Sequence, residues 1–155
     1  NSPLVETLYV NPSNDDTNIF GKKLSFISSY IDSREHCGVI NMNTFTPPSS
    51  RSFSELKTFN GCLNKKISID ESGAIKNCPS MADQYGNIED TDLATVVENQ
   101  DFKSKWRTNK DTIDTCNICE YRYVCSDCRA YTLNNDAYSK PEKCHYDPIN
   151  GAWNA

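Results

Sequence analysis

The chain of 155 residues lacks the features of membrane and exported proteins. It has no apolar run approaching the roughly 20 residues that a helix needs to cross a bilayer. Its first residues, Asn1 to Leu4, do not form the basic stretch and apolar stretch of a signal peptide. These absences predict a soluble, cytoplasmic protein that has no membrane partner.

Clustered positive charge is also missing. Basic residues occur in runs no longer than pairs such as Lys65-Lys66, and the net charge is −5. Binding to a phosphate backbone requires clustered lysine and arginine, so we predict no nucleic-acid partner. A hydrophobic content of 37% and a charged content of 24% are typical of a globular chain, with room for one domain or two small ones.

Cysteine, in contrast, is abundant, with eight residues in the chain. Eight cysteines form disulfides in an oxidising compartment or bind metal in a reducing one. Two close Cys-x2-Cys pairs, Cys116/Cys119 and Cys125/Cys128, and the lack of an export signal favour metal. We therefore predict that the cysteines bind metal and do not form a disulfide scaffold.

The spacing of the cysteines leaves the kind of metal open. Four thiolates complete a tetrahedral zinc site or hold an iron–sulfur cluster, so eight thiolates make two such sets. Five cysteines are grouped toward the C-terminus and three lie upstream, so one C-terminal cysteine must join the upstream set. The short gap between Cys119 and Cys125 suits a loop around a cluster, but spacing alone does not separate zinc from iron–sulfur.

Periodicity predicts the structure around these cysteines. Residues 66–70 alternate polar and apolar side chains, Gly73 can adopt a positive φ, and residues 74–78 return as a second strand. This pattern predicts a β-hairpin that brings Cys62 and Cys78 near each other.

A helix is expected to begin at residues 90–92 and to break near Asn99, with Phe102 and Trp106 as core anchors of a second helical turn. Upstream, the sequence suggests strands at residues 4–10 and 23–28, with a loop at residues 11–18. A further strand could begin at Val39-Ile40, and residues 46–52 suggest a turn-rich connection. We expect a small, cysteine-rich α+β domain with a β-hairpin, a short helix and a cluster-binding C-terminal loop. It would span residues 60–155, after an N-terminal segment (residues 1–59) that could end an upstream domain.

The cysteine order and the sequence between the cysteines resemble a known family. Cys62-x10-Gly73-x4-Cys78 is followed by Cys116-x2-Cys119-x5-Cys125-x2-Cys128 and by Cys144, with the intervening text ISIDESGAIKNCPSM, YGNIEDTDLATVV and CNICEYRYVCSDCRAY. This pattern resembles the SPASM domain, the C-terminal auxiliary iron–sulfur module of radical SAM peptide maturases. Its loop, with KPEKCHYDP after it, is most similar to the maturases of grasp-with-spasm systems. The resemblance covers residues 60–148, and one departure is the last loop gap, which has two residues here and three in the family.

The resemblance implies two [4Fe–4S] clusters. The first cluster would be held by Cys62, Cys78 and Cys128, with Cys37 as the candidate fourth ligand. The second would be held by Cys116, Cys119, Cys125 and Cys144. Without Cys37, the first cluster would have an open iron. The chain lacks the Cys-x3-Cys-x2-Cys motif that holds a SAM-cleaving cluster, so its own enzymatic activity and its catalytic residues stay unassigned.

As an auxiliary module of a ribosomal-peptide maturation system, the chain would bind a precursor peptide, relay electrons, or do both. The partners implied by the resemblance are that peptide, an ATP-grasp ligase and an upstream radical SAM domain. The rival hypothesis is a zinc-stabilised module that binds a protein or peptide without redox chemistry. Around the thiolates, we expect Tyr121, Tyr123 and Tyr131 to shield a cluster, Arg122 and Arg129 to balance its charge, and Asp127 to form a turn.

Overall fold

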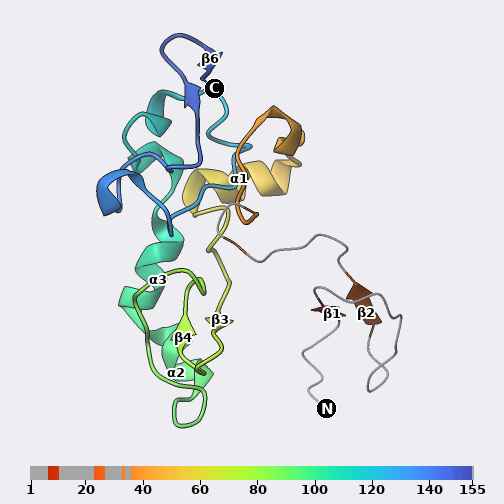
Figure 1. Cartoon of the computed structure of the whole chain (residues 1–155), viewed down its shortest axis with the longest axis vertical. Helices are drawn as coiled ribbons and strands as arrows, with labels where there is room; N and C mark the ends of the chain where they lie inside the picture. The colour runs from red at the N-terminus through yellow and green to blue at the C-terminus, as the bar shows by residue number, and fades with distance from the viewer. Residues whose placement is uncertain (1–6, 11–22, 27–32, 34–35, 155) are drawn as a thin grey trace. The chain divides into compact units, whose positions relative to one another are not determined.

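The computed structural model describes residues 7–10, 23–26, 33 and 36–154 (Figure 1). The chain forms two compact units, Asn1–Cys37 and Gly38–Ala155. The sequence predicts a domain boundary between residues 59 and 60. The boundary between the compact units does not test that prediction. Among the described residues, no helix has both the length and the apolar character to cross a membrane.

The first unit contains two short strands, β1 (Thr7–Val10) and β2 (Lys23–Phe26), which pair in parallel. Each strand lies inside a stretch that the sequence predicts to be extended. The predicted loop at residues 11–18 lies outside the described residues.

The second unit is a small α+β domain rich in cysteine, as predicted. Its helices are α1 (Ser50–Thr58), α2 (Leu93–Glu98) and α3 (Gln100–Arg107). Its strands form two antiparallel pairs: β3 (Ser68–Ile69) with β4 (Ile75–Lys76), and β5 (Tyr146–Asp147) with β6 (Ala152–Trp153). Short 3₁₀ turns lie at Met42–Thr44, Lys110–Thr112, Cys116–Ile118 and Leu133–Asn135.

The β3–β4 hairpin has the turn that the sequence predicts. Gly73 adopts a φ of +82°, a conformation that costs a residue with a Cβ atom more than it costs glycine. Asp70 stabilises the turn, because its Oδ1 accepts hydrogen bonds from the backbone N–H groups of Ser72 (2.9 Å) and Ala74 (3.0 Å). Its other oxygen lies 2.8 Å from the Lys76 ammonium on β4. The predicted hairpin is therefore confirmed, with strands shorter than the alternating sequence pattern.

The two consecutive helices α2 and α3 meet at Asn99, where the sequence predicts a break. The Asn99 side chain accepts hydrogen bonds from the N–H groups of Asp101 (2.8 Å) and Phe102 (3.4 Å), so it caps α3. Asp92 occupies the corresponding position before α2 but makes no side-chain capping bond.

An apolar core joins the hairpin to the two helices. Ile75, Val96 and Phe102 are buried together, and Phe102 is 0% exposed. Its ring packs edge-to-face against Tyr85 and Trp106, with centroid distances of 5.0 and 5.5 Å. The prediction that Phe102 anchors the core is confirmed.

Helix α1 was not predicted. Ser49 begins it, because the Ser49 hydroxyl accepts a hydrogen bond from the Ser52 N–H (3.1 Å), within the stretch that the sequence suggests is a turn-rich connection. The strand predicted at Val39-Ile40 is only an isolated bridge between Ile40 and Cys144.

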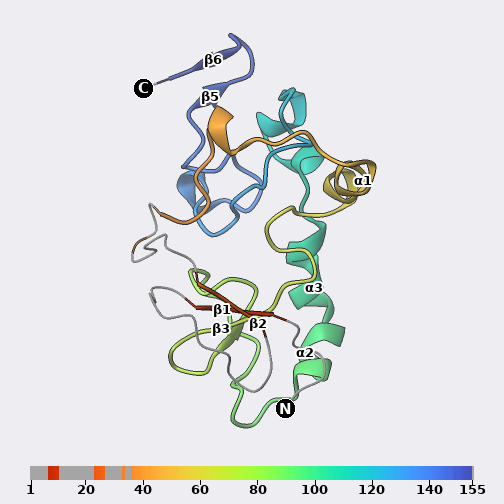
Figure 2. The same ribbon diagram turned by 90° about the vertical axis from the view of Figure 1, so that its right-hand side faces the viewer.

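Helix α3 links the hairpin region to the cysteine-rich segment (Figure 2). Near the hairpin, the Asn77 side-chain amide donates to the Phe102 carbonyl (3.1 Å). One turn later, the Trp106 carbonyl accepts from the Asn60 N–H (2.7 Å). These carbonyls are four residues apart, which is about 6 Å along a helix axis. The segments that carry Cys62 and Cys78 are therefore held against adjacent turns of one helix.

Candidate metal centre

One pocket of the second unit gathers half of the cysteines. About 290 Å³ of space that protein atoms do not fill lies in this pocket, which we call the four-cysteine pocket. The cysteines that line it are Cys116, Cys119, Cys125 and Cys144. These are the residues that the sequence predicts to hold the second cluster, and the structure brings all of them together.

Short turns place the first three of these thiols. Cys116 opens a 3₁₀ turn after Thr115, whose φ of +67° is unusual for a residue other than glycine. The turn closes when the Cys119 N–H donates to the Cys116 carbonyl (3.0 Å). The chain then reverses again as the Cys125 N–H donates to the Tyr121 carbonyl (3.0 Å). Two tight reversals thus return three thiols to one pocket.

The fourth thiol comes from a distant part of the sequence. Cys144 follows a turn in which its N–H donates to the Pro141 carbonyl (3.1 Å), and Pro141 pairs with Thr132 in an isolated bridge. Cys144 itself pairs with Ile40. The pocket therefore closes only when the C-terminal segment is folded.

Aromatic rings form the other wall of the four-cysteine pocket. The ring of Tyr121 packs against those of Phe45 and Tyr146, with centroid distances of 5.1 and 5.0 Å. The centroid of the Trp153 ring lies 5.0 Å from that of Tyr146. The Tyr146 hydroxyl donates to the Glu120 carboxylate. Tyr121 lines the pocket as expected, and the apolar wall would limit access of water to a bound group.

Tyr123 does not line the four-cysteine pocket, contrary to the shielding role that the sequence suggests. Its hydroxyl instead donates to the Asp111 carboxylate, at 2.9 Å to Oδ1. Arg122 lines the pocket and donates to the same carboxylate through Nε (3.2 Å).

Burial makes three of the thiols in this pocket weaker acids. Burial raises the pKa of the Cys116 thiol to about 11, and the nearby Lys110 ammonium acts in the opposite direction. Burial also raises the pKa of the Cys119 and Cys125 thiols. At neutral pH these cysteines are therefore thiols in the absence of a metal, whereas a coordinated thiol is deprotonated. Loading the pocket must release protons.

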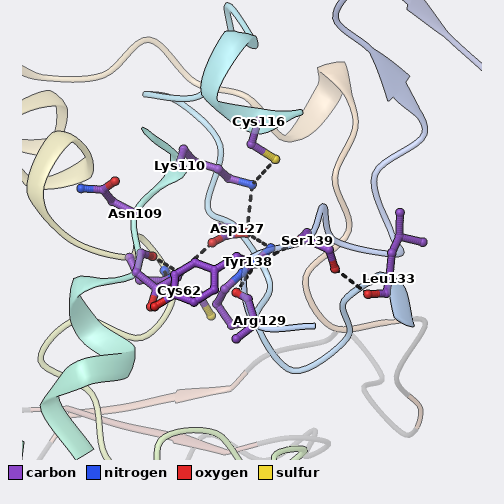
Figure 3. Close-up of polar contacts among 12 residues, drawn as sticks. Cys62, Asn109, Lys110, Cys116, Asp127, Arg129, Leu133, Tyr138 and Ser139 are labelled. Atoms are coloured by element: carbon purple, nitrogen blue, oxygen red, sulfur yellow. Dashed lines mark hydrogen bonds and ion pairs between the residues drawn. The ribbon is translucent and has the colours of Figure 1, made fainter. Parts of the chain in front are cut away.

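A group of buried charges lies beside the pocket (Figure 3). Lys110 Nζ is 3.6 Å from Cys116 Sγ and 2.9 Å from Asp127 Oδ1, and the same oxygen is 2.8 Å from Arg129. Asp127 adopts a φ of +61° in an irregular segment, so the turn that the sequence predicts at this residue is not formed. Burial by itself lowers the pKa of Lys110, but the charge and the hydrogen bond of Asp127 act in the opposite direction, and the pKa lies above its usual value.

Sequence reasoning missed Lys110. The chain has 16 lysine and arginine residues, and no local pattern separates this one from those on the surface. Its proximity to Cys116 along the sequence was the one available signal. Charged residues of this kind are almost never fully buried unless they are paired, so the structure was needed to find it.

The cysteines predicted to hold the first cluster, Cys37, Cys62, Cys78 and Cys128, do not line the four-cysteine pocket. Gly61, next to Cys62, packs against Ser126, because an added Cβ at Gly61 would lie 3.0 Å from the Ser126 carbonyl oxygen. Asn60 also donates to Asp127 Oδ2 (2.7 Å). Cys62 and Cys128 thus lie on segments that pack together, and Cys78 reaches the same helix through Asn77. Cys37 belongs to the first unit, so its role as the fourth ligand stays a prediction.

The cysteines and the other ligand-type side chains leave the kind of metal open. All eight cysteines are among the described residues, and none of them is in a disulfide. Within the described part of the chain, no three or more His, Cys, Asp or Glu side chains are arranged to hold one metal ion. Zinc requires its ligands about 2.0–2.3 Å from one point, whereas thiolates that hold a multi-iron cluster bind separate irons and stand further apart.

Comparisons with known proteins find relatives of one kind. AdoMet-dependent heme synthases from Nitratidesulfovibrio vulgaris and Oleidesulfovibrio alaskensis are each 27% identical to the chain, over 92 and 82 residues, and one from Methanosarcina barkeri is 29% identical over 92 residues. The chain is related to radical SAM proteins. The matches cover 57%, 52% and 57% of the chain but only 25%, 21% and 26% of these relatives. No family model and no solved structure matches the chain.

Proposed function

We propose that this chain is an auxiliary iron–sulfur module of a radical SAM system that matures a ribosomally synthesised peptide. The observation that carries the proposal is the four-cysteine pocket, where four cysteines line one space together with an aromatic wall. Those four cysteines would hold one [4Fe–4S] cluster. Cys62, Cys78 and Cys128, with Cys37, would hold a second one. The relatedness to radical SAM proteins supports iron–sulfur chemistry in general.

A [4Fe–4S] cluster bound in the pocket supplies a centre that takes up or releases one electron. The chain's own residues do the rest. Tyr121, Tyr146 and Trp153 limit water at the pocket, which tunes the redox behaviour of the group they surround. Lys110 brings a positive charge to the thiolate of Cys116.

The peptide substrate and the ATP-grasp partner rest on the cysteine pattern and the sequence between the cysteines. The chain would hold the precursor peptide near a cluster, relay electrons during its modification, or do both. Because the chain lacks the SAM-cleaving motif, a radical SAM domain must supply the radical.

A second candidate is favoured by the comparisons. The relatives are named AdoMet-dependent heme synthases, so the same module could serve heme synthesis in place of peptide maturation. The two candidates share the four-cysteine pocket and differ in the molecule that is modified.

A reconstituted reaction separates these candidates. The chain, produced without oxygen together with a radical SAM domain that carries the SAM-cleaving motif, would be incubated with AdoMet, a reductant, and either the precursor peptide or a heme precursor, and products would be identified by mass spectrometry. We expect a mass change on the peptide only. A change on the heme precursor only would replace the peptide proposal with the second candidate.

Cysteine variants then distinguish peptide binding from electron relay. We expect Cys144→Ala to abolish peptide modification while the peptide Kd stays within about twofold of the unmodified protein. Ser126→Ala is the matched control, because Ser126 is an exposed residue of the same loop. Normal modification by the Cys144→Ala protein would contradict a role for the four-cysteine pocket.

A further inference from the structure

The most unusual feature outside the predicted ligands is the set of buried charges beside the pocket: Lys110, Asp127 and Arg129, which we call the charge hub. The Lys110 and Arg129 side chains are 5% and 4% exposed, and that of Asp127 is 1% exposed. Burial of charge is costly unless each charge is paired and hydrogen-bonded. The hub therefore needs a physical reason.

The hub is not balanced internally. It contains two cations, Lys110 and Arg129, and one carboxylate, Asp127, so one positive charge is in excess. The carboxylate carries only one negative charge, which Oδ1 shares between both cations, while Oδ2 accepts from the neutral Asn60 amide (2.7 Å). Among the described residues, the buried Nε of Arg129 also has no hydrogen-bond partner. The hub therefore carries a net positive charge.

Lys110 brings that charge to the four-cysteine pocket. Its ammonium donates to Cys116 Sγ at 3.6 Å, within range of an N–H···S hydrogen bond, and Lys110 lines the four-cysteine pocket itself (Figure 3). Arg122 lines the same pocket, but Asp111 already pairs with it at 3.2 Å and its side chain is 30% exposed. The net positive charge of the hub is therefore next to the four pocket cysteines, because Lys110 is the member of the hub that contacts Cys116. A thiolate-ligated cluster would supply a compensating negative charge.

We infer that Lys110 is a positioning residue that acts through Cys116 to raise the reduction potential of the group in the four-cysteine pocket. This inference rests on the proposed function. Reduction adds negative charge to a cluster, so a fixed cation in a low-dielectric interior stabilises the reduced form over the oxidised one. Asp127 holds the ammonium in place from the loop between Cys125 and Cys128.

The hub treats the two predicted cysteine sets differently. It reaches the segment of Cys62 through the neutral amide of Asn60, whose Oδ1 accepts from the Cys62 N–H (2.9 Å). It reaches the other set through a full positive charge. Neutralising Lys110 should therefore shift one redox transition and leave the other unchanged.

The test is a potentiometric titration of the full chain, purified without oxygen and followed by electron paramagnetic resonance. In the Lys110→Gln protein, at the wild-type midpoint, we expect the ratio of reduced to oxidised cluster to fall about tenfold for one transition, which is about 59 mV for one electron. Lys110→Arg keeps the charge and should titrate with the wild type. Lys105→Gln is the surface control, since Lys105 pairs with the exposed Asp83.

Iron and sulfide content decides how each result is read. An iron-loaded Lys110→Gln protein with unshifted transitions would overturn the inference, and so would a Lys110→Arg protein with an equal shift. If Lys110→Gln loses iron, Lys110→Met, which keeps the volume without a polar atom, is titrated instead. Loss of iron from both variants would also contradict the inference, because Lys110 would then be a structural requirement. Wild-type protein without iron or sulfide would instead refute the proposed function.

Discussion

Two regions of the second unit are built on different physical principles. In the hairpin–helix region, residues 68–107, Ile75, Val96 and Phe102 form an apolar core. In the cysteine region, residues 110–153, the buried side chains include three cysteines and the charge hub. Hydrophobic burial can stabilise the first region, whereas in the second the buried apolar side chains, such as Ile113 and Tyr146, lie among the cysteines and the charge hub. A small region of this kind usually obtains its stability from disulfides or metal.

The backbone shows the same contrast. The hairpin–helix region has a hairpin turn at Gly73 and two regular helices, α2 and α3, of which α3 is capped by the Asn99 side chain. The cysteine region consists of short turns, and Thr115 and Asp127 adopt positive φ values without being glycine. Such residues persist only where the surroundings over-determine them, and each of these two lies next to or between predicted ligands. A bound group would therefore contribute to the order of this region.

The largest expected effect comes from removing the metal. Chelation under anaerobic conditions should unfold the cysteine region and leave the hairpin–helix region folded, because only the latter has its own apolar core. Hydrogen exchange read by mass spectrometry should show loss of protection in residues 110–153 and retained protection in residues 93–107. Equal loss of protection in both regions would mean that they form one cooperative unit, contrary to the comparison.

The next largest effect targets the apolar core. Phe102→Ala should lower the free energy of unfolding of the hairpin–helix region by about 3–5 kcal/mol, since it leaves a cavity at a fully buried position. The chain has two tryptophans, so a Trp153→Phe background leaves Trp106 as a reporter of this region in urea unfolding. Ile118→Ala is the control, because Ile118 is 60% exposed and should change stability by about 0.5 kcal/mol or less. A loss of iron before any loss of Trp106 signal would show that Phe102 supports the cysteine region first.

A smaller effect is expected at the junction of α2 and α3. Asn99→Ala should cost about 1 kcal/mol, because the side chain caps the N-terminus of α3. Asp92→Ala is a matched comparison, since Asp92 precedes α2 without a side-chain capping bond. The same urea measurement should give a clearly smaller change for Asp92→Ala. Equal losses for the two variants would remove the capping explanation.

The smallest effect is the pH dependence of the hairpin. The Lys76 ammonium, followed by the Ser72 hydroxyl, holds the pKa of Asp70 well below its usual value of 3.8. Because the pKa is depressed on folding, the contribution to stability is present above about pH 4 and is lost as the pH falls through the folded pKa. Asp70→Asn should flatten the decline in stability between about pH 5 and pH 2, as followed by Trp106 fluorescence. An unchanged decline in the variant would assign it to other carboxylates.

Local patterns in the sequence predicted the hairpin–helix region well. Alternation around Gly73 and helical spacing around Phe102 are short-range signals, and packing preserved both. Helix α1 was missed because Ser49 and Ser50 lie among residues typical of turns, and their role as a helix start depends on the backbone that follows. The grouping of the four pocket cysteines was predicted from their order and the family resemblance.

The charge hub could not be predicted in the same way. Whether Lys110 is solvated or buried depends on packing of segments that are distant in sequence, such as Asn60 against Asp127. Asp127 was expected to form a turn but lies in an irregular segment, and its pairing with Lys110 joins residues 17 positions apart in the sequence. The membership of Cys37 in a ligand set stays a prediction, because Cys37 belongs to the other unit.

The central claim is that Cys116, Cys119, Cys125 and Cys144 hold an iron–sulfur cluster. Its most direct test is the content of iron, acid-labile sulfide and zinc in protein purified without oxygen, for the wild type and a variant in which these cysteines are replaced by serine. The account predicts about eight irons and eight sulfides per wild-type chain, if both proposed clusters are [4Fe–4S], and about half of each in the variant. Zinc without sulfide in the wild type, even after anaerobic reconstitution with iron and sulfide, would contradict it and leave a zinc-stabilised binding module.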